Sequence, residues 1–116
     1  MNILIIEDNK SKYKNLEDTL NRVVDDPSIT WEQTRNNGLV AIKEHNFIND
    51  NDLEPFDMLI CDNYLPIYDD DWETKPFGQD IVEEVRERFG LTDLAIVMCS
   101  SEDVGEFDYN YKIRYD

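Results

Sequence analysis

Acidic side chains follow two apolar segments of the sequence, at the point where each segment ends. Residues 2–6 form an almost fully apolar run that ends in Glu7 and Asp8, and residues 58–61 form another that ends in Asp62. Such runs are typical of strands buried on both faces of a parallel sheet, whose carboxyl ends meet at one edge. Carboxylates gathered at one edge repel one another unless a cation lies among them, and oxygen ligands suit Mg²⁺. The sequence therefore predicts a magnesium site built by Glu7, Asp8 and Asp62.

A hydroxyl and an amine are expected at the same edge. Ser100 follows a further apolar run at residues 94–99, and Lys112 lies in a later segment of alternating apolar residues. Beside a bound metal, one carboxylate can attack a phosphorus atom while the metal and a lysine offset the negative charge of the phosphoryl oxygens. A neighbouring hydroxyl can donate a hydrogen bond to those oxygens. This set of residue types indicates phosphoryl transfer to a carboxylate.

The segments between these runs have the spacing of helices. Their apolar residues recur every three or four positions, which indicates helices with one buried face. The alternation of strands and helices predicts a parallel sheet with helices on both sides. The expected helices cover residues 12–24, residues 39–47 after Asn37 and Gly38, and residues 81–89, and the expected strands cover residues 2–6, 29–32, 58–61 and 94–99. Residues 107–115 alternate well enough to form a fifth strand.

The motifs at these strand ends give the chain a resemblance to the receiver domains of two-component response regulators. They are ILIIEDN at the first strand, FDMLICDNYLP at the third, IVMCSS at the fourth and YNYK near the end. The resemblance extends over essentially the whole chain, so a single domain is expected over residues 1–116. It implies an α/β, flavodoxin-like fold with a doubly wound parallel five-stranded sheet of order 2-1-3-4-5.

The resemblance also implies a role for each residue of the site. Glu7 and Asp8 would be the acidic pair that binds Mg²⁺, and Asp62 would be the phosphoacceptor. The other matches are Tyr64, whose backbone carbonyl would bind Mg²⁺, Ser100 and Lys112, which would bind the phosphoryl group, and Tyr109, at the place of a rotating aromatic switch residue. An ordinary strand aromatic is an equally good interpretation of Tyr109.

The sequence departs from the family near its end and in one loop. Too few residues separate Ser100 from Tyr109 for a full fourth helix, so a shortened one is expected around residues 102–106, and the fifth helix is expected to be absent. The sheet face that the fifth helix would cover is then expected to be covered by a second copy of the chain, a partner protein or folded-back residues 113–116, with a homodimer favoured. The acidic segment 68–74 would form a lid or a partner contact.

The composition limits the partners and the compartment. The chain has 116 residues with 27 acidic and 11 basic side chains, a net charge of −16 that repels nucleic acid and anionic membranes. No segment is long and apolar enough to span a bilayer, and the N-terminus does not resemble a signal peptide, so a cytoplasmic location is expected. Cys61 and Cys99 end apolar runs and are expected to be buried free thiols, whereas His45 is expected to lie on the surface.

Three functions are consistent with these residues. The favoured one is a stand-alone module that accepts a phosphoryl group on Asp62 from a histidine kinase or a phosphotransfer protein, has no output domain and does not turn over a separate substrate. A pseudo-receiver would use the same fold as a protein-interaction module without phosphorylation. An acidic decoy would present carboxylates to a DNA-binding protein in place of phosphates.

Overall fold

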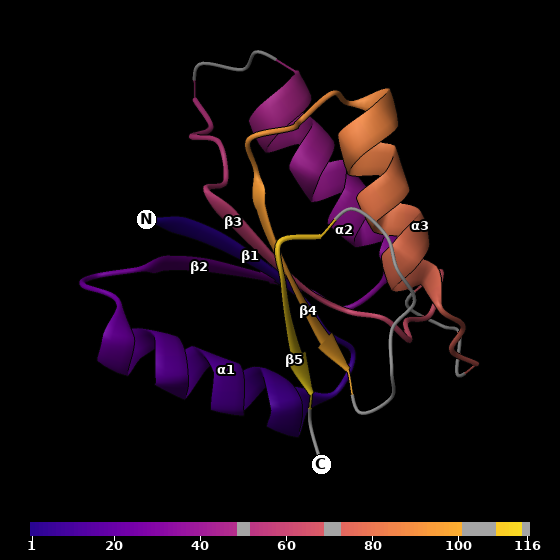
Figure 1. The fold of residues 1–116 in the computed structure, drawn as a ribbon. Coiled ribbons are helices and arrows are strands. Elements are labelled where there is room, and N and C mark those ends of the chain that lie inside the picture. Colours follow the sequence, from indigo (N-terminus) through magenta and orange to yellow (C-terminus); the bar gives the residue numbers. More distant parts are fainter. Residues whose placement is uncertain (49–51, 69–72, 101–108, 115–116) are drawn as a thin grey trace.

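The computed structural model describes residues 1–48, 52–68, 73–100 and 109–114. Within these ranges the chain alternates strands and helices, as the sequence predicts (Figure 1). Helices α2 and α3 each continue into a wider π-helical turn, labelled η. The elements in chain order are β1 (Asn2–Ile6), α1 (Lys10–Val23), β2 (Ser28–Glu32), α2 (Arg35–Ile42), η1 (Lys43–Phe47), β3 (Met58–Asp62), α3 (Phe77–Glu83), η2 (Glu84–Arg88), β4 (Ala95–Ser100) and β5 (Tyr111–Arg114).

The strands form one parallel sheet in the order β2-β1-β3-β4-β5, which confirms the predicted topology. The chain winds in one direction from β1 to β2 and in the opposite direction from β3 onward, so the switch point lies between β1 and β3. Ile6 is paired with Cys61 in the register of these two strands. The residues that follow β1 and those that end β3 therefore meet at the same edge of the sheet, where ligands bind in folds of this kind.

Helices cover both faces of the sheet (Figure 1). α1 packs on one face through Tyr13 and Leu20, and α2 and α3 lie side by side on the other. Because successive strand residues point to opposite faces, strands covered on both sides are apolar throughout. The buried strand residues are Ile3, Ile5, Ile60, Val97 and Cys99 on the α1 face, and Leu4, Ile6, Leu59, Cys61, Ile96 and Met98 on the α2–α3 face. Both cysteines are buried free thiols, as predicted.

The second helix begins earlier than the sequence pattern predicts. α2 starts at Arg35, so Asn37 and Gly38 lie inside the helix and do not precede it. Thr34 caps the helix, because its side-chain oxygen accepts a hydrogen bond of 3.1 Å from the backbone N–H of Asn37. A Cβ at position 38 would lie 2.4 Å from the Cδ1 atom of buried Ile6. The close approach of α2 to β1, and not a turn, accounts for this glycine.

On the α1 face of the sheet, the described apolar side chains of β1, β3 and β4 are covered by the chain itself. Ile60, Val97 and Cys99 lie on this face and expose 4%, 7% and 1% of their surface. The described residues of β1, β3 and β4 therefore leave no bare apolar patch on this face. The side chains of β5 lie outside the described part of the structure, so the expected homodimer stays a prediction.

Several expectations concern residues outside the described ranges. They are the shortened fourth helix around residues 102–106, residues 69–72 of the acidic segment, and residues 115 and 116 at the end of the chain. The expected absence of a fifth helix likewise concerns the chain beyond Arg114. The described part of the predicted fifth strand, Tyr111–Arg114, pairs with β4 as expected.

His45 is not the simple surface residue that the sequence predicts. Its ring stacks on Phe56 with 4.1 Å between the ring centres, and its Nδ1 atom lies 2.8 Å from the carbonyl oxygen of Glu54. The side chain therefore fastens η1 to the segment that leads into β3.

None of the described helices is long and apolar enough to cross a membrane.

Candidate functional site

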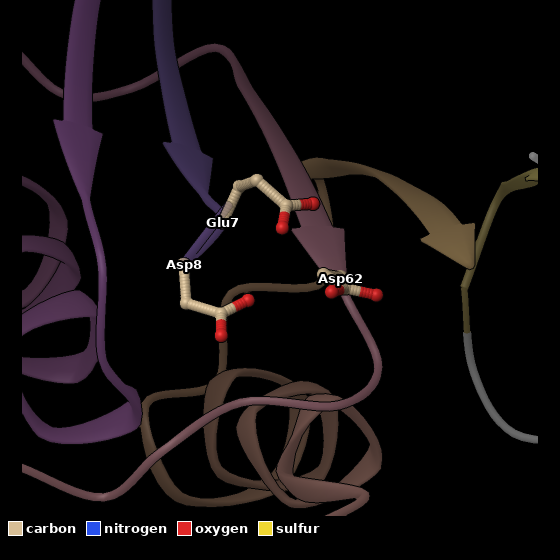
Figure 2. Close-up of side chains that lie close together, drawn as sticks. All are labelled: Glu7, Asp8 and Asp62. Carbon is tan, nitrogen blue, oxygen red and sulfur yellow. The ribbon is translucent and has the colours of Figure 1, made fainter. Parts of the chain in front are cut away.

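Carboxylates gather where β1 and β3 end (Figure 2). Glu7 and Asp8 follow β1 directly, and Asp62 is the last residue of β3. One side-chain oxygen from each of the three lies within 4.8 Å of the other two. Glu7 and Asp62 are buried, with 1% and 5% of their surface exposed, whereas Asp8 is open to solvent. The structure thus brings together the three acids that the sequence singled out.

The sheet and the start of α1 hold Glu7 in place. Its backbone N–H donates to the carbonyl oxygen of Glu32 at 3.0 Å, and its Oε1 accepts a hydrogen bond of 3.0 Å from the N–H of Asn9. Its Oε2 is buried and has no hydrogen-bond partner among the described residues. A buried carboxylate oxygen without a partner costs free energy. Since three converging carboxylates supply hard oxygen ligands, a divalent cation such as Mg²⁺ fits this site.

Burial and mutual repulsion make the two buried acids harder to ionise. Burial, followed by the negative charge of Asp62, raises the pKa of Glu7 from 4.5 to about 8. Burial also raises the pKa of Asp62, and the charge of Asp8 adds to that rise. The positive charge of Lys12, in the first turn of α1, acts against both rises. A bound cation would favour the ionised form of both acids still more strongly.

The loop that follows Asp62 is fastened to the start of α3. The backbone N–H groups of Asn63 and Tyr64 donate hydrogen bonds to Asp62, which lowers its pKa. Asn63 is buried, and its carbonyl oxygen accepts a hydrogen bond of 2.9 Å from the N–H of Gly78. Its Oδ1 atom accepts a second hydrogen bond, of 3.3 Å, from the N–H of Gln79. The first turn of α3 therefore fixes the loop that orients the candidate phosphoacceptor.

Gly78→Ala should destabilise the chain, because α3 approaches this loop too closely for a side chain. A Cβ at position 78 would lie 2.6 Å from the carbonyl oxygen of Asp62 and 2.6 Å from the Cα atom of Asn63. Backbone atoms cannot move aside as the end of a side chain can, so we expect a loss of about 2 kcal/mol or more in urea unfolding. Gly38→Ala is the control, because its close contacts are atoms of the Ile6 side chain, and a loss as large as that of Gly78→Ala would contradict this account.

Two aromatic residues that the sequence analysis did not single out support the acidic pair. Nε1 of Trp31 donates a hydrogen bond of 2.7 Å to the carbonyl oxygen of Glu7. The Trp31 ring stacks on Tyr13 with 4.0 Å between the ring centres, and the Tyr13 hydroxyl donates to Glu17 at 2.6 Å. The expected strand order could have indicated that Trp31 lies beside Glu7, because β2 adjoins β1 and Trp31 stands near the end of β2.

Lys12 and Asn9 are two further residues of the site that the sequence analysis missed. The side chain of Asn9 caps α1 by accepting a hydrogen bond of 3.0 Å from the N–H of Lys12, and its own N–H binds Glu7. An asparagine just before a lysine-rich helical segment is a recognisable helix start. Because α1 begins directly after β1, its first turn lies at the edge where the acids gather.

The other predicted site residues lie on or next to the neighbouring strands. Ser100 is the last residue of β4, and Lys112 is paired with Met98 in the register of β4 and β5. The side chains of Ser100 and Lys112 fall outside the described part of the structure. Tyr109 precedes β5 and packs, partly buried, against the core on the α2–α3 side, and Tyr64 exposes 36% of its surface. The roles of these four residues stay predictions.

Solved structures with this arrangement of strands and helices include many response regulators. The Mn²⁺-bound form of response regulator Rcp1 has a TM-score of 0.73 and 15% sequence identity, over 97% of this chain and 79% of that one. Response regulator RPA3017 in red light signalling of R. palustris has a TM-score of 0.71 and 16% identity, over 97% and 78% of the two chains. Chemotaxis protein CheY4 of Vibrio cholerae has a TM-score of 0.69 and 17% identity, over 97% and 84%.

This chain therefore has the fold of response-regulator receiver domains, which confirms the resemblance seen in its motifs. No protein-family model matches the sequence, and no curated protein matches it either. At identities this low the likeness defines the fold alone, so the function has to be argued from the chemistry of the site.

Proposed function

We propose that this chain is a phosphoacceptor signalling module in which Asp62 receives a phosphoryl group from a histidine kinase or a phosphotransfer protein. One observation carries the proposal: two buried acids meet an exposed third at the switch point of a receiver fold, and an oxygen of Glu7 has no hydrogen-bond partner in the described part of the chain. Ligands of doubly wound sheets bind at this point. Buried acids with raised pKa values, in a place where a ligand can bind, are typical of functional sites.

Each acid has a part in the proposed reaction. Mg²⁺ held by Glu7, Asp8, Asp62 and the backbone carbonyl of Tyr64 would supply positive charge beside the transferred group. A carboxylate oxygen of Asp62 forms a bond to phosphorus as the bond between phosphorus and the nitrogen of the donor histidine breaks. The N–H groups of Asn63 and Tyr64 orient that carboxylate before the donor arrives.

In the proposed function, residues on or next to the last two strands bind the phosphoryl group and respond to it. The hydroxyl of Ser100 donates a hydrogen bond to the phosphoryl oxygens, and the amine of Lys112 offsets their charge. Tyr109 packs against the core beside β5, so a change in its packing can carry the state of the site to a partner. The chain acts through the partner that reads its phosphorylated state, and not through turnover of a separate substrate.

Acetyl phosphate with Mg²⁺ tests this function, with the intact mass of the chain as the readout. We expect one phosphoryl group per chain, labile to base and to hydroxylamine as an acyl phosphate is, and far less of it when Mg²⁺ is withheld. A chain that binds Mg²⁺ and gains no phosphoryl group would be a pseudo-receiver. The acidic-decoy function rests only on the net charge of −16, because the carboxylates of Glu7 and Asp62 are buried and cannot imitate exposed phosphates.

A further inference from the structure

The last two residues of β2 hold the main chain on both sides of Glu7. The carbonyl oxygen of Glu32 accepts a hydrogen bond of 3.0 Å from the N–H of Glu7, and Nε1 of Trp31 donates one of 2.7 Å to the carbonyl oxygen of Glu7. The first bond continues the pairing of β1 with β2, in which Ile6 lies opposite Glu32. The second bond is made by a side chain, so it depends on which residue occupies position 31.

The carbonyl group that Trp31 binds belongs to the peptide unit that joins Glu7 to Asp8. A peptide unit is planar, so a hydrogen bond to its oxygen restricts the directions in which the chain enters and leaves it. The side chains of Glu7 and Asp8 project from the two ends of this unit, beside Asp62 (Figure 2). The indole therefore acts on the relative placement of two of the three carboxylates, although its bond is to the main chain.

Tyr13 of α1 fixes the ring of Trp31. Trp31 lies on β2, an edge strand of the sheet, and is only partly buried. Its ring stacks on that of Tyr13, with 4.0 Å between the ring centres and 4° between the ring planes. Tyr13 is buried, and its hydroxyl donates to Glu17 at 2.6 Å. Because the indole has lost its rotational freedom on folding, its N–H is directed at the peptide unit before any ligand binds.

Tyr13 is connected to Glu7 by a second route, along the start of α1. The N–H of Tyr13 donates to the carbonyl oxygen of Asn9 at 3.0 Å, and the N–H of Asn9 donates to Oε1 of Glu7. Trp31 and Asn9 therefore hold the main chain and the carboxylate of the same residue. With Oε1 engaged, Oε2 of Glu7, which has no hydrogen-bond partner among the described residues, is the oxygen left to a cation.

We propose that Trp31 is a positioning residue of the metal site: through the peptide unit between Glu7 and Asp8, it places their carboxylates for a divalent cation. This inference rests on the proposed function, since it concerns the same Mg²⁺ site, and it adds a residue that does not itself bind the metal. Residues that hold metal ligands in place contribute strongly to metal affinity, and Mg²⁺ demands near-ideal geometry. A merely structural tryptophan would instead contribute to stability and leave the affinity unchanged.

Urea unfolding at a series of Mg²⁺ concentrations measures stability and affinity together. The unfolding free energy without Mg²⁺ gives the stability, and its rise with Mg²⁺ gives the dissociation constant of the metal. Trp31→Phe keeps an aromatic ring for the stack with Tyr13 but has no N–H. We expect it to raise the Mg²⁺ dissociation constant about tenfold, at the lower end of the usual range because the lost bond is to the main chain.

Two control variants separate positioning from stability. Tyr13→Phe removes the hydrogen bond to Glu17 and keeps the stacked ring. Asn46→Ala removes two hydrogen bonds, of 3.0 and 2.9 Å, to the main chain of Phe56, which precedes β3 at the opposite edge of the sheet. Asn46→Ala should lower the stability without Mg²⁺. Both controls should keep the Mg²⁺ dissociation constant within about twofold of the parent value, because neither changes a contact of Glu7.

Tyr13→Leu keeps the question open to test if Trp31→Phe does not fold. It leaves the indole N–H in place and takes away the ring that fixes it, so the N–H has to be immobilised when the metal binds. We expect the Mg²⁺ dissociation constant to rise about threefold or more. An unchanged constant in this variant would overturn the inference, because the stack would then have no part in the metal site.

The possible results distinguish this inference from the proposed function. If Trp31→Phe loses stability but binds Mg²⁺ as the parent does, Trp31 is not a positioning residue, and the proposed function stands. The inference is also wrong if Asn46→Ala weakens Mg²⁺ binding as much as Trp31→Phe does, because the effect would then follow stability. A parent chain that Mg²⁺ does not stabilise would contradict both the inference and the proposed metal site. Since no phosphodonor is present, these results do not depend on the phosphorylation test.

Discussion

Asp62→Asn should abolish the acyl phosphate that forms on the parent chain with acetyl phosphate and Mg²⁺. The amide has nearly the shape of the carboxylate but is not a nucleophile, so the intact mass should stay that of the unreacted chain. The variant should remain folded, since the substitution removes one negative charge from a cluster of three acids.

Asp93→Asn is the matched control for this experiment. Asp93 is an exposed aspartate in the segment before β4, and the same substitution there should leave phosphorylation unchanged. Circular dichroism and a melting curve show whether each variant is folded. If Asp62→Asn still gains a base-labile phosphoryl group, the acceptor lies elsewhere and the assignment of Asp62 is wrong. The assignment of the fold does not depend on this result.

Without a metal, the chain should become less stable as the pH rises from about 4.5 to about 8. Glu7 has a pKa of about 8 in the folded chain against an ordinary value of 4.5, so over this range the folded chain holds a proton that the unfolded chain releases. The stability that this proton provides is complete below the lower value and is lost as the pH rises through the higher one. The raised pKa of Asp62 acts in the same direction. Melting temperatures in a series of metal-free buffers measure the effect.

Mg²⁺ should reverse that loss, and should do so most at high pH. The metal binds ionised carboxylates, so its affinity grows over the same range in which the metal-free chain loses stability. At a concentration of about 100 times its dissociation constant, Mg²⁺ stabilises the folded chain by about 2.7 kcal/mol. For a chain of this length that raises the melting temperature by roughly 10 °C. Asp8→Asn removes one of the three carboxylates and should abolish most of this gain.

A comparison of Glu7→Gln with Glu83→Gln separates the effect of Glu7 on the pH dependence of stability from the general effect of charge. Repulsion across a chain of net charge −16 also lowers stability at high pH, and either substitution relieves it equally. Only Glu7→Gln, which imitates the protonated acid, should flatten the metal-free pH dependence. Glu83 is an exposed residue of α3, so its variant should follow the parent. A metal-free parent whose melting temperature stays constant or rises toward pH 8 would show that Glu7 is not buried as described.

Local sequence pattern was sufficient to predict the central strands and the acids at their ends. β1, β3 and β4 are covered on both faces, so each appears in the sequence as an unbroken apolar run, and Glu7 and Asp62 stand where such a run stops. Parallel strands end at a common edge, which makes the meeting of these acids a consequence of local pattern. The strand order depends on pairing between distant segments, and it was predicted through the resemblance of several motifs together.

Local pattern was misleading where packing between distant segments decides the conformation. Gly38 has the appearance of a helix breaker in the sequence, yet it lies inside α2, where a Cβ would press on the Ile6 side chain. The spacing of residues 39–47 and 81–89 predicted the helices but not their π-helical turns, whose hydrogen bonds are one residue longer than those of an α-helix.

The surroundings of the acids depend on how distant elements pack together. Distances between elements decide the hydrogen bond from Trp31 to Glu7 and the effect of the Lys12 charge on Glu7. They also leave the Oε2 atom of Glu7 without a partner among the residues that the structure describes. The contact of Phe47 with Phe89 likewise exists only because α2 and α3, which are far apart in the sequence, lie side by side. Burial and hydrogen bonding of a side chain depend on which distant atoms surround it, and a periodic pattern along one segment carries no information about those atoms.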